Sequence, residues 1–194
     1  MSNEEKEQLD LFYNAVVLAT ERHRGQKRLD GEDYINHLIR VHGSVCNFKD
    51  FIESNVCSVA MLHDILEDTD TSYNELKRLF GRDIAVSVAL LTRIETIPYD
   101  VYVNLIKVSN DQDAIKVKIA DLQDNLSTIN GIPDEEKRER LKKRYEKALK
   151  VLINRKSDYV FSEEQIRREQ EKSLSFEKEY NLRYMGKEQS ENES

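Results

Sequence analysis

The chain has 194 residues, of which 39% are hydrophobic and 35% are charged, a composition that suits one globular domain with an appendage. Its net charge of −7 argues against a protein that wraps the nucleic-acid backbone, although a local basic pocket can still bind a small phosphorylated ligand. With only 6 Gly, 2 Pro and no Trp, residues that form turns are scarce, which argues against an all-β fold and for long helices.

Hydrophobic periodicity predicts helices through the first third of the chain. Apolar residues recur at helical spacing over residues 8–23 and 35–48, and the polar segment GQKRLDG at 25–31 is predicted to form a loop between them. The most apolar segment, residues 55–67, is predicted to form one central helix that is buried on most sides. A charged pair in so apolar a helix is costly unless a partner satisfies it.

The later segments carry helix start and stop signals. Ser72 and Glu75 form an S-x-x-E capping box for a short helix that ends at Gly81. Further helices are predicted over residues 83–93, from Pro98, over 111–129, and from Asp134 to about Arg155, with a strand at 83–92 as an alternative. The sequence therefore predicts an all-α fold of about eight helices over residues 1–160. A charged helical extension with a disordered end is predicted at 161–194.

The two cysteines and the N-terminal segment bear on the cellular compartment. Cys46 and Cys57 fit no zinc or redox spacing and fall on apolar stretches, so we expect buried free thiols. The segment MSNEEKEQ is acidic and lacks the features of a signal peptide, and no apolar run approaches about 18 residues. We therefore expect a soluble cytoplasmic protein without a membrane segment.

The seven residues HDILEDT, from His63 to Thr69, are the strongest functional signal. His37 lies 26 residues before His63, and Asp121 lies 57 residues after Asp64. Two imidazoles and two carboxylates in this order make a four-ligand metal set. Mixed nitrogen and oxygen donors suit Mn²⁺, Fe²⁺ or Zn²⁺ better than Ca²⁺ or Mg²⁺, which favour oxygen ligands.

Other polar residues extend this candidate site. Glu67 and Asp68 lie one helical turn after His63 and Asp64, where carboxylates can move protons beside a metal. Asp121, Asn125 and Thr128 share one helix face and are interpreted as a pocket floor. Arg28, in the polar loop, is a candidate for recognising a phosphate or a base.

Three further side chains are interpreted more conservatively. His23 and His42 are expected to be structural histidines, because neither belongs to the ordered ligand set. Tyr34, three residues before His37, either packs against the site or fixes the start of its helix.

Four segments, read together, resemble one family. They are ATERHRGQKRLDGEDYINH, AMLHDILEDT, FGRDIAVSVALLTR and KVKIADLQDNLST. They resemble the HD-superfamily hydrolase domain of the RelA/SpoT alarmone enzymes, and especially the small stand-alone alarmone hydrolases. The resemblance runs from about residue 8 to residue 155 and implies an HD-type helical bundle.

The resemblance implies removal of the 3′-pyrophosphate from (p)ppGpp, usually with Mn²⁺. By position, the implied metal ligands are His37, His63, Asp64 and Asp121. Glu67 and Asp68 match the acidic pair that orients or activates the attacking water. The implied nucleotide contacts are Arg28, which matches an arginine that contacts the guanine, together with Asn125 and Thr128.

The sequence departs from the family pattern at several positions, including Asp33, where a proline is frequent, and Leu29, where a basic residue often follows the arginine. Where long family members usually have ADRxHN, this chain has ADLQDN, so Leu122 and Asp124 replace a basic residue and a histidine. This reduces the positive charge expected around a pyrophosphate. Two alternatives therefore stay open: the same chemistry on another nucleotide, or a non-catalytic nucleotide-binding regulator. The charged extension leaves a homo-oligomer open.

Overall fold

The computed structural model describes residues 2–46 and 55–154, and helices account for most of them. In chain order the helices are α1 (Asn3–Arg22), α2 (Tyr34–Val45), α4 (Val56–Leu62), α5 (Ile65–Asp68), α6 (Tyr73–Leu91), α7 (Tyr99–Ser109), α8 (Gln112–Thr128), the 3₁₀ turn η1 (Ile129–Gly131) and α9 (Glu135–Ile153). No strand occurs in these two ranges, where Lys27 and Asp33 form only an isolated bridge. The predicted all-α fold is confirmed, and the strand alternative at 83–92 is wrong.

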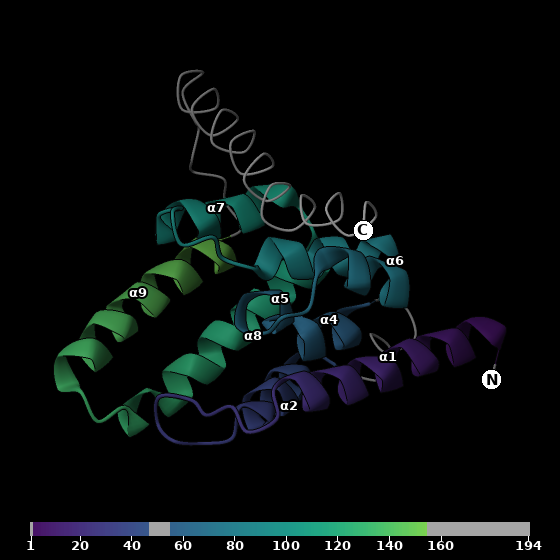
Figure 1. The fold of residues 1–194 in the computed structure, drawn as a ribbon. Coiled ribbons are helices and arrows are strands. Elements are labelled where there is room, and N and C mark those ends of the chain that lie inside the picture. The colour runs from purple at the N-terminus through teal and green to yellow at the C-terminus, as the bar shows by residue number, and fades with distance from the viewer. Residues whose placement is uncertain (1, 47–54, 155–194) are drawn as a thin grey trace, which may run out of the picture.

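Helices α4 and α8 form the centre of the molecule (Figure 1). Helices α1 and α2 pack against α4 on one side, and α6 and α7 lie on the other, while α9 packs along α8. All seven residues of α4 are buried. The central helices therefore hold the apolar core, and the segment after α4 emerges from it directly.

Local signals in the sequence fix several helix ends as predicted. The Ser72 hydroxyl accepts a hydrogen bond from the Glu75 amide, and the Asp134 carboxylate caps α9 through the Lys137 amide. Gly81 has a φ of 82°, so it interrupts α6 where the sequence predicted a helix end.

The predicted single helix over residues 55–67 is wrong, because the chain bends at His63 and Asp64. Helix α4 ends at Leu62, and α5 begins at Ile65. Asp64 has φ −102° and ψ 0°, which stops the regular helix, and its carbonyl accepts hydrogen bonds from the amides of Glu67 and Asp68. The bend ends the buried helix just before the charged residues.

The prediction of free thiols is also wrong, because Cys46 and Cys57 form a disulfide. Their Cα atoms are 5.4 Å apart, since the C-terminal end of α2 meets the N-terminal end of α4. Apolar flanking residues predicted the burial of Cys57 but could not reveal a partner that only the packing of two helices brings close.

The polar loop before α2 is held against η1. A Cβ atom on Gly131 would lie 2.8 Å from the Cβ of Asp30, so only glycine permits this close approach. The loop is closed on itself by a hydrogen bond from the Arg28 amide to the Glu32 carbonyl. It therefore presents the Arg28 side chain towards α8.

Two further predictions concern a membrane segment and the C-terminal boundary of the domain. No helix in the described ranges is long and apolar enough to cross a membrane. The predicted extension at 161–194 lies outside the described residues, and the domain boundary at residue 160 stays a prediction.

Candidate active site

The four predicted metal ligands lie together, although they come from three parts of the chain. Donor atoms of His37, His63 and Asp64 all lie within 4.8 Å of one another. Asp121 joins them from α8, with its Oδ1 3.4 Å from Nε2 of His37 and 3.9 Å from Nε2 of His63. Helix α2, the bend after α4 and helix α8 thus direct two imidazoles and two carboxylates at one centre.

Each imidazole of this centre is oriented by a hydrogen bond from its other nitrogen. Nδ1 of His63 lies 2.8 Å from the Ala60 carbonyl oxygen, which can only accept, so Nδ1 carries the proton. Nδ1 of His37 lies 2.6 Å from Oδ2 of Asp124 and donates to that carboxylate. Both Nε2 atoms are thereby left to face the centre, which is how proteins orient metal-binding histidines.

The donor set fits a divalent metal. Nε2 of His63 is fully buried and makes no hydrogen bond to any described residue, although Oδ2 of Asp64 is 3.0 Å away. Burial opposes protonation of His37, but hydrogen bonds to Asp121, Asp124 and Asp64 outweigh it and raise the pKa of His37 to about 10. Such an excess of negative charge around two imidazoles is the environment that a bound cation neutralises.

The carboxylates of Asp64 and Asp121 have further partners. The Tyr34 hydroxyl donates to Oδ2 of Asp64 at 2.5 Å, so Tyr34 packs against the site rather than only fixing the start of α2. Nζ of Lys118 lies 2.8 Å from Oδ2 of Asp121, and Nδ2 of Asn125 donates to Oδ1. Burial alone would raise the pKa of Asp121, but Lys118 and His37 hold it well below its usual range.

Glu67 and Asp68, the predicted acidic pair, line the same cavity. Oε2 of Glu67 accepts a 2.8 Å hydrogen bond from the Arg93 amide, which holds the side chain in place. Burial and the nearby charge of Asp64 raise the pKa of Glu67 to about 7, and the same two causes raise the pKa of Asp68. Glu67 can therefore gain and lose a proton near neutral pH.

A cavity of about 290 Å³ opens over this centre, near the lower end of the range for small-molecule sites. The three residues predicted to bind substrate all line it, and they also bind one another. The Arg28 guanidinium donates to Asn125 Oδ1 at 2.8 Å and to Thr128 Oγ1 at 3.2 Å. Asn125 and Thr128 lie on the same face of α8 as Asp121, as predicted.

The cavity also contains basic side chains that the sequence analysis did not identify as site residues. The Arg144 guanidinium lies 4.5 Å from the centre of the Tyr99 ring, and that of Arg93 lies 5.8 Å from it. Lys118 lies 5.2 Å from the Tyr102 ring. Nε of Arg93 and Nε of Arg144 are buried and have no hydrogen-bond partner among the described residues. Arg93, Lys118 and Arg144 all line the cavity.

Asp124 is the most connected residue that the sequence reasoning misread. Besides His37, its carboxylate binds the Arg28 guanidinium at 2.8 Å and Nε of Arg40 at 2.5 Å. Burial opposes ionisation, but these three partners hold the pKa of Asp124 well below its usual range. The sequence motif indicates Asp124 only as a replacement for a histidine, and no signal in the sequence joins it to residues more than 80 positions away.

The two remaining histidines lie outside this centre. His23 is buried, its ring stacks on Tyr34 with 4.9 Å between ring centres, and its Nδ1 lies 2.5 Å from Gln26 Oε1. Its Nε2 is buried and has no hydrogen-bond partner among the described residues, so the expected structural role of His23 stays a prediction. His42 lies instead beside the disulfide.

Comparison with solved structures finds the same fold in a metazoan orthologue of SpoT that hydrolyses ppGpp. The TM-score is 0.63 at 25% identity, over 74% of this chain and 86% of that one. The guanosine-3′,5′-bis(diphosphate) 3′-pyrophosphohydrolase of Aquifex aeolicus is 36% identical over 135 residues, which cover 66% of this chain and 19% of that protein.

The bifunctional (p)ppGpp synthase/hydrolase SpoT of Escherichia coli is 26% identical over 143 residues, covering 69% of this chain and 20% of SpoT. The chain thus spans about a fifth of the length of the curated relatives it matches. The resemblance to the RelA/SpoT hydrolase domain is confirmed. Residues 15–157 match the family model of the HD domain, so the chain belongs to the HD domain family.

Proposed function

We propose that this chain is a Mn²⁺-dependent phosphohydrolase that removes the 3′-pyrophosphate from (p)ppGpp, giving GDP or GTP and pyrophosphate. The observation that carries the proposal is the convergence of His37, His63, Asp64 and Asp121 at the floor of a cavity that also holds basic side chains. Relatives named for ppGpp hydrolysis support the choice of substrate.

The four converging residues would hold the cation through Nε2 of both histidines and a carboxylate oxygen of each aspartate. Two nitrogen and two oxygen donors suit Mn²⁺, while Fe²⁺ and Zn²⁺ are compatible with the same set. When bound, the metal supplies Lewis-acid activation of the phosphoryl group and of the attacking water. Hydrogen bonds from Tyr34, Lys118 and Asn125 keep the two carboxylates in place.

Glu67 takes the proton from the attacking water, and Asp68 orients that water. The Arg93 amide fixes Glu67, so its free carboxylate oxygen is available to the cavity. A pKa raised to about 7 makes Glu67 a base that can accept a proton and release it again near neutral pH. A protein that only bound the nucleotide would not need a buried carboxylate with this property, which argues against the non-catalytic alternative.

The two ends of the substrate bind to different walls of the cavity. Arg28, Asn125 and Thr128 form one polar wall, which suits the guanosine end. Lys118, Arg93 and Arg144 form a cationic wall next to Asp121, which suits the 3′-pyrophosphate. This wall offsets the two basic positions that ADLQDN lacks.

Incubation of the metal-free protein with ppGpp, with and without added Mn²⁺, tests the proposal. We expect GDP and pyrophosphate in a one-to-one ratio only with the metal, and no product from His63→Ala. A parallel panel of nucleoside 5′-phosphates, dNTPs and dinucleotide phosphates tests the alternative substrates. Faster turnover of a panel member than of ppGpp would assign the same chemistry to that nucleotide. Tight binding of a nucleotide without turnover of any nucleotide tested would favour a regulator.

A further inference from the structure

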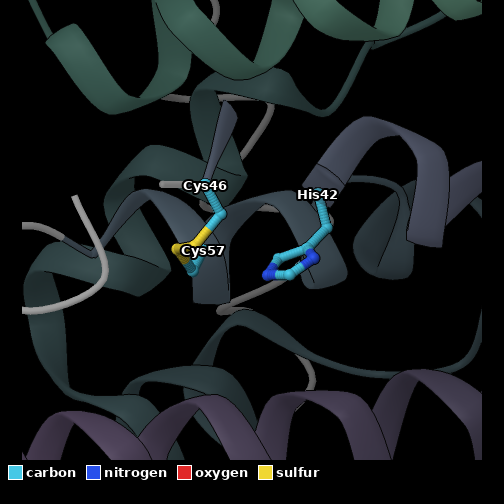
Figure 2. A group of neighbouring side chains, drawn as sticks. All are labelled: His42, Cys46 and Cys57. Carbon is cyan, nitrogen blue, oxygen red and sulfur yellow. A yellow bond between two sulfur atoms is a disulfide. The ribbon is translucent and has the colours of Figure 1, made fainter. Parts of the chain in front are cut away.

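A second group of metal-binding side chains lies outside the cavity. His42 and Cys46, one turn apart near the end of α2, meet Cys57 at the start of α4, and one donor atom from each lies within 4.8 Å of the others (Figure 2). Cys46 and Cys57 are joined as a disulfide. None of the three residues lines the active-site cavity, so the phosphohydrolase reaction leaves this cluster without a role.

The imidazole of His42 is prepared to bind a ligand. The ring is turned towards the two sulfur atoms (Figure 2). It stacks on the ring of Phe12 from α1 with 4.8 Å between ring centres, which restricts its rotation. Its Nε2 is buried and has no hydrogen-bond partner among the described residues. Burial also lowers the pKa of His42, so the ring stays neutral and keeps a lone pair.

The sulfur atoms complete a set of soft donors around this ring. Cys57 is only 3% exposed, whereas His42 and Cys46 are half-buried, so solvent reaches part of the cluster. Two thiolates and one neutral imidazole suit Zn²⁺ better than they suit Mn²⁺, because Mn²⁺ favours oxygen donors. Three protein ligands leave one of the four positions of tetrahedral zinc to solvent.

We propose that His42, Cys46 and Cys57 bind a thiophilic divalent cation when the disulfide is reduced. The ligand chemistry identifies this cation as Zn²⁺. The disulfide is the oxidised, metal-free form of the same site. Two equivalents of a low-molecular-weight thiol reduce this disulfide. The S–S bond of the protein breaks, Cys46 and Cys57 become thiols, and the two small thiols are oxidised to their own disulfide. On binding the cation, both cysteine thiols release their protons to solvent.

Both forms join α2, which carries His37, to α4, which ends just before His63. The disulfide does so covalently, and the cation does so through three ligands. Helices α2 and α4 are therefore cross-linked by the disulfide under oxidising conditions and by zinc, when it is present, under reducing conditions. Only the reduced, metal-free protein lacks the connection.

Cobalt titration of the full chain tests this site independently of the hydrolase activity, because only thiolate ligands give sulfur-to-cobalt charge-transfer absorption. The active-site donors are nitrogen and oxygen, so cobalt bound there does not contribute. We expect the phosphine-reduced protein to develop this absorption as Co²⁺ is titrated to two equivalents, one for each site, and added Zn²⁺ to bleach it. The oxidised protein should not develop it.

Matched variants complete the design. Cys57→Ser and Cys46→Ala should lose the absorption, and His42→Ala should weaken Co²⁺ binding. Ser44→Ala, an exposed position between His42 and Cys46 on α2, should match the wild type. Cys46 is half-buried, so Cys46→Ala remains informative if Cys57→Ser does not fold. A reduced, folded wild type without the absorption would overturn the proposal, as would unchanged absorption in both cysteine variants.

Discussion

Asp124 and His37 lie 87 residues apart in sequence, yet Oδ2 of Asp124 accepts a 2.6 Å hydrogen bond from Nδ1 of His37. The carboxylate fixes the tautomer and the direction of the imidazole, and it increases the basicity of the opposite nitrogen. Arg28 and Arg40 bind the same carboxylate and hold it in place.

Asp124→Asn is therefore expected to weaken Mn²⁺ binding by roughly 10–100-fold, as losses of such oriented partners do. Calorimetric titration of the metal-free protein measures the change, and Asp83→Asn, at an exposed position on α6, is the control. If KM rose while the metal affinity stayed at the wild-type value, the role of Asp124 would be to position Arg28 and not to orient His37.

Glu67 should control the pH dependence of turnover. Its raised pKa keeps it protonated at low pH, so kcat/KM rises as the pH increases and the carboxylate forms, then levels off. A bound cation favours the carboxylate, so the apparent pKa of the active enzyme should lie below about 7. Glu67→Gln should remove this rising limb and lower kcat by about 10²–10⁴-fold with metal content unchanged.

The exposed Glu95→Gln is the matched control for this profile. Asp68→Asn should also lose turnover while keeping its metal. An unaltered rising limb in Glu67→Gln would assign the titration to another group, and loss of metal in both variants would make the pair structural supports.

Arg28→Lys should raise KM for a guanosine substrate by about 10-fold or more and lower kcat less. One guanidinium binds Asp124, Asn125 and Thr128 together, a geometry that an ammonium group cannot reproduce. Loss of a hydrogen bond to a charged group costs about 1.5–3 kcal/mol, and a rise in KM alone indicates lost uniform binding. Arg24→Lys, an exposed position on the same segment, should leave both constants unchanged. A steep fall in kcat at constant KM would instead put Arg28 at the scissile phosphate.

Lys118 and the metal should substitute for each other at Asp121. Lys118 is 9% exposed and lies 2.8 Å from Oδ2 of Asp121, so Lys118→Met removes the lysine cation that pairs with this buried carboxylate. In the metal-free protein this should cost about 3–5 kcal/mol of unfolding free energy. With Mn²⁺ bound the loss should be smaller, because the metal neutralises the same carboxylate. Denaturant unfolding with chelator and with Mn²⁺ measures both values, with Lys143→Met as the exposed control. Equal losses in both conditions would contradict this coupling.

Signals within one helix allowed much of the fold to be predicted. The spacing of apolar residues gave the helices, while Ser72, Gly81 and Asp134 gave their ends. The ligands His37, His63, Asp64 and Asp121 could be proposed because their residue types and order are typical of a metal centre, and the structure brings them together.

What the sequence could not provide depends on contacts between distant segments. The role of Asp124 arises where α2 meets α8, and the Cys46–Cys57 pair arises where α2 meets α4. Arg144 reaches the cavity only because α9 packs along α8. The sequence does not predict the bend at His63 and Asp64, because no glycine or proline marks it.

The complete burial of α4 has a consequence for how the metal enters and leaves. Amides in a helix whose seven residues are all buried should exchange with deuterium only when the whole domain unfolds. His63 directly follows this segment, whereas Arg28 and the loop before α2 line the cavity. Metal exchange should therefore proceed through small local openings of the loop, at rates far above those of deuterium uptake in residues 59–62.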